Sequence, residues 1–124
     1  MQLSDRQPLA VLDLQPLTLL FGNNGSERQD MLEMFLGSCG ELIAQLKRAL
    51  EAGNWHAAEE FAHSAKGAAS STGAVRLGAI LSMINHCLKT GEPDQAKILA
   101  LGLDPLFLEV EAEISRLGAD SGQR

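Results

Sequence analysis

The stretch from Glu59 to Ala74 reads EEFAHSAKGAASSTGA, an alanine-rich segment of helical composition that carries a histidine, a lysine and a glycine. With about 100° of rotation per residue in an α-helix, Lys66, Gly67 and Ser70 fall on the same side as His63. The opposite side is mostly apolar and holds Ala58, Phe61, Ala62, Ala65, Ala68, Ala69 and Thr72. The pattern predicts an amphipathic helix with a narrow buried face and an exposed His63 imidazole.

Gly67 needs an explanation, because glycine inside a helix is about 1 kcal/mol less favourable than the alanine found at the next two positions. One turn after His63, the missing side chain leaves open space beside the imidazole, and Lys66 can bring its ammonium group there. A nucleophilic nitrogen, an open approach and a nearby cation suit a phosphoryl group. Two plainer interpretations stay open. His63 can be a surface histidine without a role, and Lys66 can pair with Glu59 or Glu60.

Cap and turn residues divide the chain around this segment into helices, and nothing alternates with period two. Ser26 and Gln29 form a potential capping box for a helix that ends at Gly53. This helix is expected to direct five apolar residues toward the core: Met31, Phe35, Ile43, Leu46 and Leu50. Asn54 can cap the histidine helix, which runs to about Ser71.

Two further helices follow the turn at Thr72-Gly73. The first ends at Gly91, and Pro93 suits the start of the second. Gly102 and the pair Asp104-Pro105 interrupt this last helix, where we expect a kink or short break, with Asp104 capping the helical segment after the break.

Short connections without a long crossover predict an all-α fold, an antiparallel up-down-up-down four-helix bundle with a kinked or broken last helix. Val11–Phe21 can add a short apolar N-terminal helix that starts near Pro16. We expect residues 1–10 to be flexible, residues 11–117 to form the bundle and residues 118–124 to be a flexible tail.

The helix before Gly91 also carries a polar stripe at helical spacing, formed by Gly78, Ser82, Asn85 and Lys89. If this helix returns antiparallel beside the histidine helix, Asn85 can hydrogen-bond one ring nitrogen of His63 and leave the other exposed as the nucleophile.

Composition excludes several classes of function. The 124 residues carry a formal charge of −6, and no Lys/Arg cluster exceeds Lys47-Arg48, so nucleic acid is not an expected partner. No apolar run approaches the length that spans a bilayer, and the N-terminus does not read as a secretory signal. Cys39 and Cys87 lie far apart among apolar residues, which favours free buried thiols and a reducing cytosol.

The segment AHSAKGAASSTGA, residues 62–74, resembles the phosphoacceptor helix of histidine-containing phosphotransfer (HPt) domains, whose signature has the form A-H-x-L-K-G-x-x. The resemblance in helix order and length extends over most of residues 11–117. It implies that His63 is phosphorylated on Nε2, that Lys66 steadies the phosphoryl oxygens and that Gly67 lets a partner approach.

Three further positions are interpreted through the same resemblance. Asn85 falls where the family tends to carry a Gln or Glu that bonds Nδ1 of the active histidine, and Asn is shorter. Ser70 is compatible with a polar neighbour of the site. Ala65 replaces a usual Leu, which should bring the helices closer or leave the core less filled.

The resemblance implies a phosphocarrier that relays a phosphoryl group between receiver-domain aspartates, or receives it from a histidine kinase. No ATP-binding loop is present in the sequence, so the chain is not expected to be a kinase or an ATPase. The expected partners are receiver domains of response regulators or a hybrid histidine kinase. The Mg²⁺ of the reaction should lie on the receiver, with no cofactor or metal on this chain, which we expect to be a cytoplasmic monomer.

Two other classes stay open at this point. Glu60 and His63 form a Glu-x-x-His element like those of di-iron bundles, but no second element is found. A helical adaptor that lost the chemistry is the other alternative, against which the joint presence of His63, Lys66 and Gly67 argues.

Overall fold

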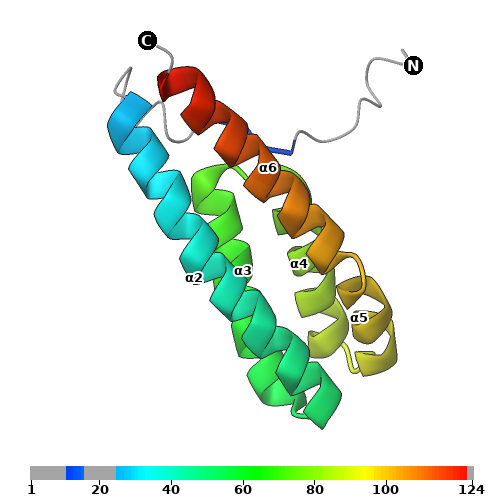
Figure 1. The fold of residues 1–124 in the computed structure, drawn as a ribbon. Helices are drawn as coiled ribbons and strands as arrows, with labels where there is room; N and C mark the ends of the chain where they lie inside the picture. The colour runs from blue at the N-terminus through cyan, green and yellow to red at the C-terminus, as the bar shows by residue number, and fades with distance from the viewer. Residues whose placement is uncertain (1–10, 16–24, 123–124) are drawn as a thin grey trace, which may run out of the picture.

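The computed structural model describes residues 11–15 and 25–122, and the regular elements in this part of the chain are helices. They are α2 (Gly25–Ala52), α3 (Trp55–Thr72), α4 (Val75–Lys89), α5 (Pro93–Ala100) and α6 (Leu103–Gly122). Successive helices run in opposite directions, with α5 and α6 together forming the broken fourth helix (Figure 1). The predicted antiparallel four-helix bundle is therefore confirmed.

The ends of the histidine helix lie where local chemistry predicts them. Asn54 precedes α3 and its side chain accepts a hydrogen bond from the Ala57 amide at 3.2 Å. Gly53 and Gly73 have positive φ angles of 73° and 85°, a conformation that glycine adopts readily. The Gly73 amide donates to carbonyl oxygens at the end of α3, which closes that helix.

The predicted capping box at the start of α2 does not form. The helix begins at Gly25, so Ser26 already lies inside its first turn. The Gln29 side chain donates instead to the Ile114 carbonyl oxygen at 3.1 Å. This amide therefore ties α2 to α6, a contact between distant segments that the local pattern could not indicate.

The last helix breaks at Leu101–Gly102, as predicted, but Asp104 is not the capping residue after the break. The Leu106 amide donates to the Gly102 carbonyl at 3.3 Å, so Asp104 lies within the first turn of α6. Its carboxylate interacts favourably with the positive, N-terminal end of the helix dipole, and it pairs with Lys47 Nζ at 2.6 Å.

The ends of the chain are only partly described. α6 continues to Gly122, so the helix does not end at Gly118. Residues 11–14 are not helical and Gln15 is in a helical conformation, while the rest of the predicted Val11–Phe21 helix lies outside the described residues. Residues 1–10 lie outside them as well.

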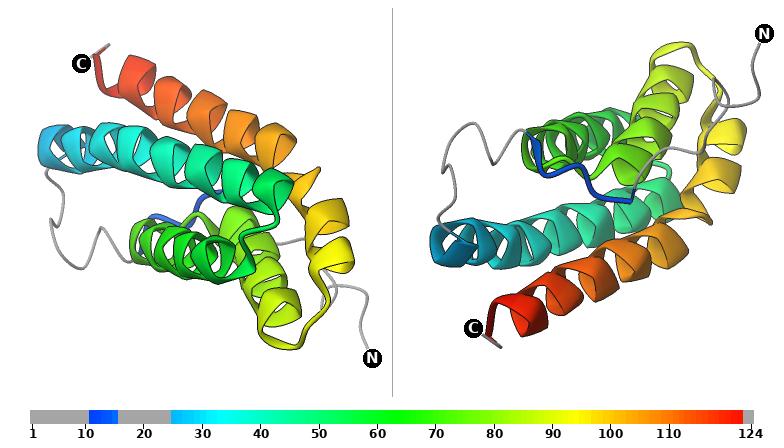
Figure 2. Two further views of the ribbon diagram at one scale, coloured as in Figure 1. Left: turned by 90° about the horizontal axis from the view of Figure 1, so that it is seen from below. Right: turned by 90° about the horizontal axis from the view of Figure 1, so that it is seen from above.

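The core lies along the bundle axis, with α3 packed against both α2 and α4 (Figure 2). Its largest fully buried side chains include Leu32, Leu46, Leu77, Leu81, Ile84, Leu103 and Ile114. The residues of α3 that are completely buried are all alanines, Ala58, Ala62, Ala65 and Ala69. Met31, predicted to face the core, is 36% exposed and the adjacent Leu32 is buried instead.

Residues 11–15 cross the turn between α3 and α4. The Asp13 amide donates to the Gly73 carbonyl at 2.6 Å. A Cβ at Gly73 would lie 1.7 Å from the Asp13 carbonyl oxygen, so only glycine permits this approach. Val11, Leu12 and Leu14 pack against the core. The segment is thus held to the end of the helix that carries His63.

Candidate functional site

His63 projects from the middle of α3 into solvent, as the sequence predicted. Within residues 11–15 and 25–122, no hydrogen bond or ion pair to its ring is found. The ring lies at a groove of about 380 Å³ between α3 and α4, lined also by His56, Glu59, Glu60, Ser64, Asn85 and Lys89. The imidazole is therefore accessible and has a polar surface beside it.

The open space at Gly67 is present. The residue is exposed, and a Cβ built there would meet no atom within 4 Å outside its own helix neighbourhood. Lys66, partly exposed, makes no ion pair with any described residue, so the pairing with Glu59 or Glu60 is not formed. Glu60 instead pairs with His56 Nε2 at 2.7 Å. The Lys66 ammonium is thus available to an incoming anion.

Asn85 approaches α3, but the predicted contact with the imidazole is not formed. Its side chain is only 3% exposed, and Nδ2 donates to the Glu59 carbonyl oxygen at 3.1 Å. The antiparallel return of α4 therefore places Asn85 beside the histidine helix, as expected. Because the side chain is short and buried, its amide bonds the backbone of α3 and not the ring of His63.

Ser70 lies on the exposed side of α3 but outside the groove that His63 lines. It borders a separate hollow with Asp13, Gly73 and Gly78. Seven residues of helix separate it from His63, about 10 Å along the axis. Ser70 is thus too far along the helix for direct contact with a group on the imidazole.

Residues 30–120 match the Hpt domain. The chain belongs to the Hpt domain family. The crystal structure of histidine-containing phosphotransfer protein B (HptB) from Pseudomonas aeruginosa PAO1 resembles this Hpt domain with a TM-score of 0.79 and 28% sequence identity. The match covers 88% of this chain and 95% of that chain. No curated protein sequence matches.

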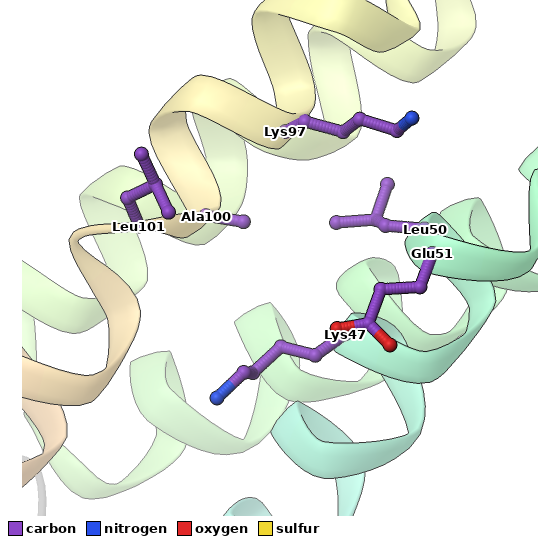
Figure 3. Close-up of a pocket in the computed structure, with 6 residues that line it drawn as sticks. All are labelled: Lys47, Leu50, Glu51, Lys97, Ala100 and Leu101. Atoms are coloured by element: carbon purple, nitrogen blue, oxygen red, sulfur yellow. The ribbon is translucent and has the colours of Figure 1, made fainter.

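Another hollow of about 380 Å³ lies between α2 and α5 of the Hpt domain, where Leu50 and Ala100 face each other (Figure 3). Its two lysines are already engaged. Lys47 pairs with Asp104, and Lys97 Nζ lies 5.3 Å from the centre of the Trp55 ring. None of the described residues that line the hollow is a histidine, so none of them offers an imidazole as a phosphoryl acceptor.

Two residues that line the His63 groove of the Hpt domain were not among the predicted site residues. His56 lies on the same face two turns earlier, and Lys89 follows Asn85 by one turn on α4. Both positions follow the helical spacing of the polar faces of α3 and α4, and this spacing is the signal in the sequence that could have identified them. In the described part of the chain, no three His, Cys, Asp or Glu side chains are arranged to hold a metal ion. None of the described helices is long and apolar enough to cross a membrane.

Proposed function

We propose that His63 accepts a phosphoryl group from the aspartate of a receiver domain, or from a histidine kinase, and passes it to another receiver aspartate. The observation that carries the proposal is the exposed imidazole, with Lys66 three residues along the helix paired to no described residue and open space at Gly67, in a chain of the Hpt domain family. The family match and the likeness to a histidine-containing phosphotransfer protein support the same chemistry.

In the transfer step, the lone pair on Nε2 attacks the phosphorus of the receiver's aspartyl phosphate. A P–N bond forms, the P–O bond to the aspartate breaks, and the carboxylate leaves with the electron pair. Such transfers depend mainly on alignment of the attacking and leaving atoms and on compensation of charge. The receiver supplies the Mg²⁺, and this chain supplies the positioned imidazole.

The side chains around His63 divide the remaining tasks. Lys66 places a cation three residues along the helix, where it can compensate charge on the phosphoryl oxygens. Gly67 leaves room for the receiver surface, because it adds no side chain one turn from the ring. We place Ser70 at the border of the docking surface and not at the phosphoryl group.

The partners of this proposal are receiver domains of response regulators, a hybrid histidine kinase, or both. The protein acts as a phosphocarrier without ATPase or autonomous kinase activity, and as a cytoplasmic monomer. A phosphocarrier needs an exposed acceptor that two partners can reach in turn, and His63 on the outer face of α3 is exposed.

The test is to incubate the protein with a radiolabelled phosphorylated receiver. We expect acid-labile label on the wild-type protein and none on His63→Gln. His56→Gln is the matched control, because His56 lies on the same helix and lines the same groove. It should retain the label. Label on His63→Gln would contradict the site, and absence of label with every receiver tried would favour the adaptor.

A further inference from the structure

The contact between Asn85 and α3 converges on the turn that carries His63. In an α-helix the amide of residue 63 donates to the carbonyl of residue 59. Asn85 Nδ2 donates to that same Glu59 carbonyl oxygen at 3.1 Å. One oxygen therefore receives a hydrogen bond from the His63 backbone and another from the neighbouring helix.

We propose that Asn85 is a positioning residue that holds the backbone turn of His63 through the Glu59 carbonyl and leaves the imidazole uncontacted. This inference rests on the proposed role of His63 as the phosphoryl acceptor. The Asn85 side chain is 3% exposed, and a buried hydrogen bond is stronger than an exposed one because water competes less. The contact thus fixes α3 against α4 at the level of the acceptor.

Such a contact matters for a protein donor and not for a small one. A docked receiver presents its phosphorus from one fixed direction, so a small displacement of the imidazole misaligns the attack. Phosphoramidate reaches an exposed ring from many directions. In that reaction the P–N bond to the imidazole forms while the P–N bond of the donor breaks, and ammonia leaves after taking up a proton. Its rate therefore reports ring access without docking geometry.

The first experiment measures amide hydrogen exchange and ring ¹⁵N chemical shifts in Asn85→Ala. We expect exchange at the His63 amide to become about fivefold faster relative to the slowest amides, the usual effect of one lost hydrogen bond. The ring shifts should stay at wild-type values. Thr72→Val is the matched control, because the Thr72 side chain is also buried and also donates to a backbone carbonyl oxygen of α3, that of Ala68, at 2.9 Å. It should leave the His63 amide unchanged.

The second experiment compares two phosphoryl donors on the same variants. Asn85→Ala should slow transfer from a radiolabelled receiver about tenfold at saturation, with unchanged receiver affinity and unchanged labelling by phosphoramidate. Unaltered exchange at the His63 amide, changed ring shifts, or equal slowing with both donors would overturn the positioning role. If no receiver labels the wild-type protein, the proposed function fails, while the exchange measurement still decides whether Asn85 holds this turn.

Discussion

Replacing Gly67 should affect stability and phosphotransfer in opposite directions. The residue lies inside α3, is exposed, and has no atom within 4 Å of an added Cβ beyond its own helix neighbourhood. Alanine is about 1 kcal/mol better than glycine at such a position. We therefore expect Gly67→Ala to raise the free energy of unfolding by about 1 kcal/mol and the melting temperature by about 4 °C.

A longer side chain at the same position should interfere with docking. Glutamine is a good helix former, so Gly67→Gln should be at least as stable as the wild type. Its side chain, however, would occupy the open space one turn after His63. We expect the rate of transfer from a phosphorylated receiver to fall at least about tenfold, an effect of the size expected when the attacking imidazole is held out of alignment with the phosphorus. A loss of rate without a loss of stability separates docking from folding.

Gly37→Ala and Gly37→Gln are the matched controls, because Gly37 is also exposed inside a helix with no atom within 4 Å of an added Cβ. Both should gain stability and transfer at the wild-type rate, since Gly37 lies outside the groove of His63. Urea unfolding gives the stability, and a time course with radiolabelled receiver gives the rate. A Gly67→Ala variant that is less stable than the wild type would refute the open space at this position. A Gly67→Gln variant that accepts phosphate at the wild-type rate would show that receiver docking does not use this space.

Three further predictions concern stability. Gly73→Ala should lower the free energy of unfolding by well over the roughly 1 kcal/mol that we expect for Gly91→Ala. Both glycines have positive φ, but only Gly73 lies against Asp13. Equal urea midpoints for the two variants would contradict this expectation. Burial raises the pKa of the Cys39 thiol from 9.0 to about 11. The contribution of this thiol to the free energy of unfolding should therefore be complete below about pH 9 and decline as the pH rises towards about 11. Urea unfolding at these two ends of the range should show the decline in the wild-type protein and not in Cys39→Ala. Asp104→Ala should cost less than about 1 kcal/mol by thermal melting, since its ion pair is exposed.

The features that the sequence predicted correctly depend on neighbours along the chain. Gly53 and Gly73 end helices because their positive φ angles suit glycine, and Asn54 caps the next helix without tertiary help. The exposure of His63 follows from the alanines on the opposite side of the same helix. The open space at Gly67 was also predictable, because the residue lies on the polar side of α3, and no described residue outside its own helix neighbourhood comes within 4 Å of an added Cβ.

The errors arise where two helices meet. Periodicity placed Asn85 on a polar stripe, but its depth in the groove depends on how α4 is rotated and shifted against α3. Gln29 fits a capping box by spacing, yet its amide bonds α6, which no local pattern reports. Met31 and Leu32 lie about 100° apart around α2, so which of the two is buried depends on how the neighbouring helices pack against it.

The small side chains that α3 buries have a consequence for how far the acceptor stands from the protein. The completely buried side chains of this helix are those of Ala58, Ala62, Ala65 and Ala69, each a single methyl group. Any bulkier side chain there would lift the helix outward or force its neighbours apart. The height of His63 above the molecular surface therefore depends on the size of the side chains buried under α3. Substitution of these four alanines by larger residues would change which partners can reach the imidazole.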